Sequence, residues 1–327
     1  MEVEDGAELC FPQFPNTSCR KPLFPWPQTV TNMLYSISPI TATLNLLIII
    51  SISHFRQLHT PTNILLLSLA VSDLLVGLVL MPVEILSRTS CWFFGDFVCA
   101  MYTLLCLIIS SSSIGDIVLI SVDRYVAICD PLHYNTKVTV RRVKFCVCMC
   151  WLCSFTYSLL YVKDLPTQPG SYKFCYGACF IAPDKSSLLF DLFVNLIVPV
   201  TVIVALYLRI FAVAVSQARA MRSHITAVTL QHSVTPKAKK SELKAARKLG
   251  VLVVVFLICI CPLYIITWVD HNWIVALIEP FSVILHLSNS CLNPVIYAFL
   301  YPWFRKSVKL IVTLQILQPG SSETNML

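Results

Sequence analysis

Ionisable residues inside long apolar stretches are the first sign of chemistry in this sequence. Four positions qualify: Asp73, Asp116, the pair Asp123-Arg124, and Asp191. A charged group in the hydrocarbon core of a membrane is costly, so such residues are rare and usually bind an ion or ligand or take part in a switch. The pattern therefore predicts ion pairing and cation binding within apolar segments.

Asp123-Arg124-Tyr125 ends the third apolar stretch and has two interpretations. Arg124 could simply extend to the membrane interface. The sequence favours a switch instead, because Glu242 opens the sixth stretch on the same side. An Arg124–Glu242 contact would tie two helix ends together, and breaking it would let the sixth helix move and admit a partner.

Asp73 has no basic neighbour in sequence, but polar residues lie at a similar depth in other stretches: Asn45, Ser112, Asn289 and Asn293. Hard cations take oxygen ligands, so these groups could hold a sodium ion, the one cofactor that the sequence suggests. A neutral, hydrogen-bonded aspartic acid is the alternative, and the sequence leaves both open.

Prolines interrupt three of the apolar stretches. In Asn293-Pro294-x-x-Tyr297 the proline removes a backbone donor, which neighbouring groups must compensate. The seventh stretch is therefore expected to contain a hinge, and Pro199 and Pro262 are expected to bend the fifth and sixth.

The elements that position these residues follow from composition. The chain is 57% hydrophobic and only 13% charged, and a membrane helix needs about 20 mainly apolar residues. Seven such stretches are present: 33–54, 62–86, 97–128, 143–162, 188–214, 245–269 and 274–299. We expect an all-α membrane protein, a seven-transmembrane helix bundle at 33–300. An N-terminal segment at 1–32 precedes it, and a short inner surface helix and tail at 301–327 follow.

Most of the 24 Lys and Arg residues fall on one side of this bundle, which predicts that side to be cytoplasmic and the N-terminus extracellular. The glycosylation sequon at Asn16 agrees. The acidic start of the chain does not resemble a cleavable signal peptide. The net charge of +7 is interpreted as an inner face beside anionic membrane lipid and not as nucleic-acid binding.

Three classes of membrane protein fit seven spans. A transporter is expected to carry an internal repeat of spans, and none is evident. An enzyme needs a convergent acid–base or metal cluster, whereas the histidines are scattered along the chain. A receptor is therefore favoured, and we expect no enzymatic activity.

Seven motifs, one in each span, resemble those of rhodopsin-like, G-protein-coupled receptors. They are Asn45, Asp73, Asp123-Arg124-Tyr125, Trp151, Pro199 with Tyr207, Phe256-x-x-Cys259-x-x-Pro262, and Asn293-Pro294-x-x-Tyr297. The segment from Asn289 to Phe304 is also similar to the fingerprint of trace amine-associated receptors, NSxxNPxxYxxxYxWF.

This resemblance implies a plasma-membrane receptor for small volatile or biogenic amines. It further implies an olfactory role and signalling through a stimulatory G protein to cAMP. A non-olfactory aminergic receptor and, less favoured, a transporter are the alternatives. The implied partners are a protonated amine, a heterotrimeric G protein of the stimulatory or olfactory type, and membrane lipid.

The resemblance also indicates an amine site, with one departure from the pattern. Amine receptors usually carry an aspartate eighteen residues before the arginine of the third span, and here that residue is Cys106. Asp191, eight residues before Pro199, matches an aspartate of fish members that lack the third-span acid. It is expected to be the counter-ion of the amine; a solvated acid at a helix start is the alternative.

Five further residues complete the predicted ligand site: Leu107, Ile260, Tyr264, Trp268 and Leu287. Ile260 stands where most relatives have tryptophan, so the floor of the pocket is expected to be deeper or the switch weaker. Tyr264 and Trp268 could supply cation–π contact or ordinary core packing.

Three other acids have less certain roles. Glu84 and Glu279 could hold the second cation of a diamine or could be solvated charges at the entrance, and the second interpretation is preferred. Asp116 lies about 15 Å below Cys106 along a helix, too deep for the ligand, and is expected to be structural.

Disulfides are implied by the family. Cys99 and Cys179 should pair, as is general in this class. A second bridge should join the N-terminal segment to Cys175. Cys19 is the preferred partner because it follows the sequon, and Cys10 is the alternative.

Overall fold

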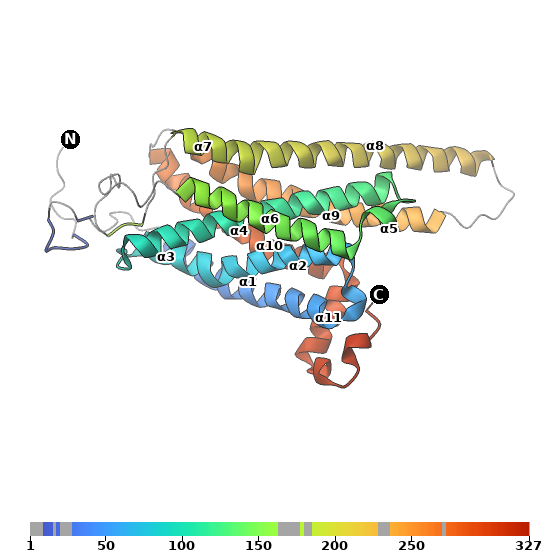
Figure 1. Ribbon diagram of the computed structural model, residues 1–327, viewed down its shortest axis with the longest axis horizontal. Helices are drawn as coiled ribbons and strands as arrows, with labels where there is room; N and C mark the ends of the chain where they lie inside the picture. Colours follow the sequence, from blue (N-terminus) through green and yellow to red (C-terminus); the bar gives the residue numbers. More distant parts are fainter. Residues whose placement is uncertain are drawn as a thin grey trace.

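The computed structural model describes residues 9–15, 18–19, 28–162, 177–179, 185–227, 236–269 and 273–326. Seven helical rods run side by side along the long axis of the molecule (Figure 1). The rods are α1 (Gln28–His54); α2 (Pro61–Leu75) with α3 (Met81–Thr89); α4 (Gly95–Cys129); α6 (Val140–Val162); α7 (Lys185–Asp191) with α8 (Val198–Ala227); α9 (Pro236–Ile266); and α10 (Trp273–Leu300).

Each predicted span coincides with one rod, so the seven-helix prediction is confirmed. The main difference is length. The fifth rod continues to Ala227 and the sixth begins at Pro236, beyond the predicted limits of 214 and 245. Within the described residues, five rods are long and apolar enough to cross a membrane, and α10 taken together with α11 (Pro302–Val312) would be a sixth. The apolar part of α9, Val253–Ile266, is shorter, and α9 packs along α10.

The surface and interior of the bundle suit lipid rather than water. Large apolar side chains such as Leu78, Phe145 and Phe211 are more than half exposed, which would be an aggregation hazard in water. Polar residues such as Asn45 and Asp73 are buried instead. The chain therefore places its hydrogen-bonding groups in the interior, where protein partners replace the missing water.

Two rods contain a π-helical segment, η2 (Val76–Leu80) and η3 (Leu192–Ile197). Each ends just before a proline that begins the next helix, Pro82 in α3 and Pro199 in α8. Proline cannot donate the backbone hydrogen bond of an α-helix, and the wider π turn accommodates the interruption. Pro199 was expected to bend the fifth span; the disturbance takes the form of this π segment.

Disulfides tie together one end of the bundle, called the disulfide end below. The Cys99–Cys179 bond implied by the family is present. A second bond, which the sequence did not predict, joins Cys10 to Cys91 in the α3–α4 connection. Cys10 is therefore not the partner of Cys175. Cys19 is also disulfide-bonded, whereas Cys175, its predicted partner, lies outside the described residues.

The N-terminal segment, the α3–α4 connection and the connection between α6 and α7 meet at this end. The backbone N–H of Trp92 donates to the carbonyl of Gly177 at 2.9 Å. Gly177 has φ +110°, and a Cβ at this position would lie 2.6 Å from the Cβ of Cys10. Glycine is therefore required here both for its conformation and for the close approach of the Cys10–Cys91 bridge. The Asn16 sequon lies outside the described residues.

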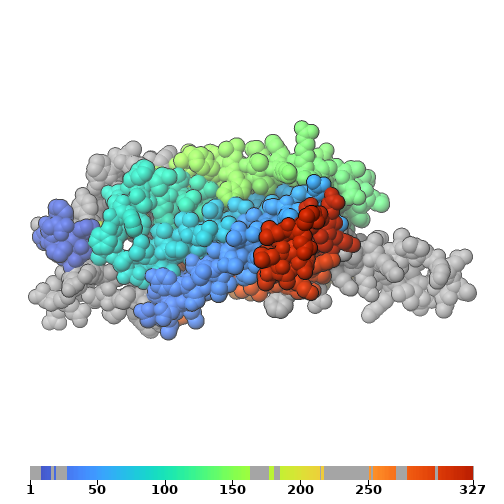
Figure 2. Space-filling view, turned by 90° about the horizontal axis from the view of Figure 1, so that it is seen from below, coloured from blue at the N-terminus to red at the C-terminus, as the bar shows by residue number. Residues whose placement is uncertain are grey.

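At the opposite end, called the Arg124 end, the chain turns into α11, which the sequence predicted at 302–314. Trp303, Phe304 and Ser307 form its buried side. The tail then returns to the first rod, where Ser321 hydrogen-bonds His54 at 2.9 Å and Met326 is buried. Figure 2 shows this C-terminal part lying against α1.

Candidate functional site

A cavity of about 200 Å³ opens near the disulfide end, between α4, α7–η3, α9 and α10. It is lined by Cys106, Leu107, Ser110, Ser111, Ile114, Leu188, Asp191, Asn195, Leu263, Tyr264, Thr267, Trp268 and His286. Five of the seven predicted ligand residues are in this set. The structure thus brings together Cys106, Leu107, Asp191, Tyr264 and Trp268, which are distributed over three rods.

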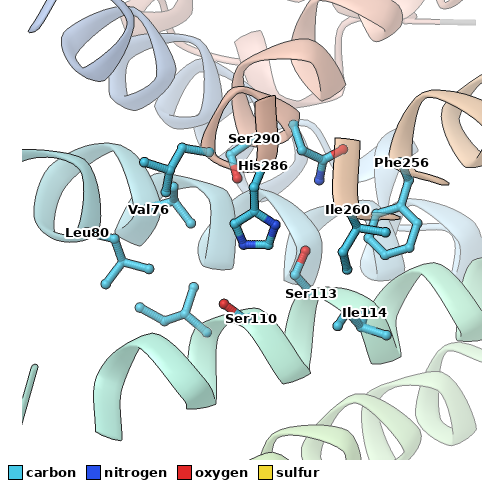
Figure 3. A pocket seen from close by; sticks show the side chains of 12 residues that line it. Val76, Leu80, Ser110, Ser113, Ile114, Phe256, Ile260, His286 and Ser290 are labelled. Atoms are coloured by element: carbon cyan, nitrogen blue, oxygen red, sulfur yellow. The ribbon is translucent and has the colours of Figure 1, made fainter. Parts of the chain in front are cut away.

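Ile260 and Leu287, the other two predicted ligand residues, line a second cavity of about 40 Å³. The two cavities share Ser110, Ile114 and His286, so they adjoin. The second cavity, called the lower cavity below, lies against Ile260 and Phe256 (Figure 3). The lower cavity is consistent with the deeper pocket floor expected from Ile260, and the alternative, a weaker switch, stays a prediction.

Asp191 is held in position by two neighbours. It ends α7, and its Oδ1 accepts hydrogen bonds from the hydroxyl of Tyr157 at 2.6 Å and from Nδ2 of Asn195 at 2.7 Å. Tyr264 also lies beside the carboxylate. A carboxylate has about four lone-pair sites, so Asp191 keeps acceptor capacity for a ligand in the cavity. Asn195, four residues later on the same helix face, could have been found from spacing, whereas Tyr157, on α6, could not.

The acids at the mouth of the bundle are already paired. Arg88 contacts Glu84 at 3.0 Å and Glu279 at 2.6 Å, and the hydroxyl of Tyr102 donates to Glu84 at 2.9 Å. Because one guanidinium serves both carboxylates across α3 and α10, the structure favours neither of the sequence interpretations. The two acids form an internal ion cluster instead of solvated charges or a vacant cation site.

Removing Arg88 should change what the mouth accepts. In Arg88→Met the two carboxylates lose their cation, so we expect a diamine to gain at least about tenfold in potency relative to a monoamine of equal length. Paired dose–response curves on wild type and variant measure this ratio. Lys185→Met is a control that removes an exposed base at the same end of the molecule. An unchanged ratio in Arg88→Met would show that the cluster does not exclude a second cation.

Asp73 lies in a buried polar cluster halfway along the bundle. Nδ2 of Asn293 donates to its Oδ2 at 2.7 Å, and Nδ2 of Asn45 donates to the Ser290 carbonyl at 2.9 Å. Among the described residues, four buried side-chain oxygens here lack a hydrogen-bond partner: those of Asn45, Asp73 (Oδ1), Asn289 and Asn293. Buried acceptors normally have a partner, so these four oxygen atoms are suited to bind a small cation or a water molecule. The hydroxyl of Ser112, in contrast, donates to Ile109 in its own helix at 3.0 Å.

Asp116 is separate from the amine cavity. Its Oδ2 accepts from Ser68 at 2.8 Å, and Ser68 accepts from the indole N–H of Trp151 at 3.0 Å. The chain of hydrogen bonds joins α2, α4 and α6 in the interior. This arrangement agrees with the structural role expected for Asp116.

Arg124 forms a polar group with three other residues at its end of the bundle: Asp123, Thr62 and Tyr134. Its Nη2 contacts Oδ2 of Asp123 at 2.6 Å and Oγ1 of Thr62 at 2.6 Å. Thr62 donates to the same Asp123 oxygen at 2.8 Å, and the hydroxyl of Tyr134 donates to its Oδ1 at 2.8 Å. Burial and the neighbouring Asp123 carboxylate raise the pKa of Tyr134 to about 12, so its hydroxyl stays a donor. The side chain of Glu242 lies outside the described residues, and the Arg124–Glu242 contact stays a prediction.

The other predicted switch residues lie on α4, α8 and α10, and one of them, Asn293, belongs to the Asp73 cluster. The hydroxyls of Tyr207 and Tyr297 are buried and, within the described chain, lack a hydrogen-bond partner. Tyr125 packs against Ile128 and Ile210. Pro294 lies inside α10. Tyrosines with unused hydroxyls at one end of the bundle are suited to exchange partners when the helices move.

Comparison with known proteins identifies the family. Residues 44–297 match the model of the 7 transmembrane receptor (rhodopsin family). Trace amine-associated receptor 13c of Danio rerio is 36% identical, over 98% of this chain and 97% of its own length. Trace amine-associated receptor 9 of Mus musculus is 38% identical, over 99% of this chain and 96% of its own. These relatives are receptors and not enzymes. The chain therefore belongs to the rhodopsin family of seven-transmembrane, G-protein-coupled receptors and, within it, to the trace amine-associated receptors.

Proposed function

We propose that this chain is a plasma-membrane receptor that binds a small protonated amine against Asp191 and couples to a G protein at the Arg124 end. The observation that carries the proposal is the Asp191 carboxylate. It lines a cavity of about 200 Å³ and is oriented by Tyr157 and Asn195 through one oxygen.

The physical argument concerns the cost of taking an ammonium group out of water. That cost is several kcal/mol unless a carboxylate pairs with the cation. Cys106, at the usual third-span position, also lines the cavity but is neutral and cannot serve. The mouth carboxylates, Glu84 and Glu279, are paired with Arg88. Among the described residues that line this cavity, Asp191 is the acid that an amine would meet, and Tyr264 and Trp268 supply aromatic side chains beside it.

The orientation in the membrane is part of the proposal. Disulfides persist in oxidising compartments, which supports an orientation with the disulfide end outside the cell. The N-terminal segment 1–32 would then be extracellular, with glycan at Asn16, and the helices of 33–300 would span the membrane. Residues 301–327 would form the inner surface helix and cytoplasmic tail. The bridge from Cys19 to Cys175 would be a further tie at the outer end.

Signalling would follow the arrangement at the inner end. We propose that Arg124 leaves Asp123 and Thr62 when α9 moves, and that a stimulatory or olfactory-type G protein then binds and raises cAMP. Glu242 would hold α9 in the inactive state, and a sodium ion near Asp73 would stabilise that state. An olfactory role is preferred over a non-olfactory aminergic one because of the resemblance of the whole chain to trace amine-associated receptors.

An exchange assay tests the proposal. Membranes containing the receptor and a stimulatory G protein are exposed to short alkyl and aryl-alkyl amines and to the alcohols of equal length. We expect guanine-nucleotide exchange with at least one amine and none with its alcohol, because only the ammonium pairs with Asp191. Equal responses to amine and alcohol would overturn the amine assignment. Uptake of labelled amine without exchange would instead indicate the transporter alternative.

A further inference from the structure

His286 is the one titratable side chain shared by the two cavities. It lies on α10 and lines both the amine cavity and the lower cavity. In Figure 3 its ring projects from α10 between the rods and faces Ser110 and Ser113 of α4. The sequence did not single out this residue for ligand binding, and the amine proposal above does not use it.

The hydrogen-bonding capacity at this place is unused. Across the described residues, no protein hydrogen bond or ion pair reaches the imidazole of His286 or the side chains of Ser110 and Ser113. A neutral imidazole has one donor and one acceptor nitrogen, and each hydroxyl can both donate and accept. Interior polar groups are normally satisfied, so three of them facing one space are suited to a polar partner from outside the chain, either water or a group of the ligand.

The size and lining of the lower cavity limit that partner. At about 40 Å³ it has room for a group the size of one to three water molecules. Its other walls are mainly apolar, including Val76, Leu80 and Ile109, and Asn289 and Ser290 add polar groups on the side of the Asp73 cluster. Among its described lining residues there is no carboxylate, so a second ammonium group would enter without a counter-ion in direct contact, at a high desolvation cost. A small uncharged polar group meets both conditions.

We propose that His286, together with Ser110 and Ser113, forms a second subsite that binds a neutral hydroxyl group at the far end of the amine ligand. The ligand would then be a hydroxylated monoamine: its ammonium lies at Asp191, its apolar body fills the space between, and its hydroxyl reaches His286. This inference rests on the proposed amine function and adds to it the chemical class of the ligand.

Matched ligand pairs test the subsite: tyramine against phenethylamine, and aminopentanol against pentylamine. The quantity measured is the ratio of potencies within each pair, by nucleotide exchange. In wild type we expect the hydroxylated member of at least one pair to be roughly tenfold more potent, since one hydrogen bond is worth about that factor. His286→Leu should bring this ratio close to one. His286→Gln, which retains a donor and an acceptor, should keep part of the preference and shows that the site still folds.

Asp191→Asn separates this inference from the amine proposal. It should weaken both members of a pair by a similar factor and leave their ratio unchanged. A ratio of one or less for both pairs in wild type, or a preference that survives His286→Leu, would overturn the hydroxyl subsite while the counter-ion assignment stands. If neither member of either pair stimulates exchange in wild type, the amine function fails and this inference fails with it.

Discussion

Asp191→Asn should weaken every amine agonist by roughly ten- to a hundredfold, because the ammonium loses a charge-assisted hydrogen bond worth about 1.5–3 kcal/mol. The substitution keeps the shape of the side chain and removes its charge. Dose–response curves for the most potent amine, with surface expression measured in parallel, give the result. A normal response would place the counter-ion elsewhere, and Glu84 would be the next residue to test.

Substitutions of two neighbours of Asp191 distinguish the effect of the carboxylate's charge on potency from the effect of its orientation. Tyr157→Phe and Asn195→Ala each remove one hydrogen bond to Oδ1 of Asp191 but leave the carboxylate charged. We expect each to reduce potency less than Asp191→Asn does. If they reduce the potency as strongly, the orientation of the carboxylate and not its charge dominates.

Cys106→Asp combined with Asp191→Asn tests whether an acid on the opposite wall of the cavity restores binding. The ligand would then bind in the reversed orientation, and the preference for its apolar part would change.

Arg124→Ala should abolish agonist-stimulated nucleotide exchange while the receptor still reaches the cell surface. The guanidinium is the group at that end of the bundle that we expect the G protein to contact, and alanine cannot replace it. Exchange at normal amplitude in this variant would contradict the switch role. Ligand binding, measured on the same membranes, shows whether the cavity is intact.

Thr62→Val is the matched variant for the same switch. Its hydroxyl accepts from Arg124 and donates to Asp123, so valine removes two contacts of the resting arrangement and leaves the arginine in place. We expect higher exchange without agonist, by up to roughly tenfold for a loss of about 1.5 kcal/mol. A fall in basal exchange would show that Thr62 supports the active state instead.

The bundle was predictable from sequence because its signal is strong and local. A span needs about 20 apolar residues, and each predicted stretch matches a rod. Asp191 and Cys106 were assigned to the cavity because the motif prolines and Arg124 fix their depth along a helix. Lengths at the inner ends were not predictable in this way, since α8 and α9 continue as polar helix after the apolar stretch ends.

Other features depend on contacts between distant segments, and no local pattern encodes them. Tyr157 reaches Asp191 from α6, and Arg88 pairs with Glu279, which lies 191 residues away in sequence. The Cys10–Cys91 bond needs both cysteines within a Cα separation of 5.7 Å, which the fold alone decides. His286 is one of several histidines scattered along the sequence, and its unused hydrogen-bonding capacity becomes evident only when the cavities are seen.

The π-helical segment η3 has a consequence for comparing receptors position by position. An α-helix turns about 100° per residue, so one additional residue in a wider turn rotates everything before it by roughly that angle relative to everything after it. Asp191 directly precedes this segment, and Pro199 follows it after one intervening residue, Val198. In a relative with an uninterrupted helix, an aspartate eight residues before the same proline would face a different neighbour. Equal numbering from the proline therefore identifies equivalent side chains only between receptors that share the π turn.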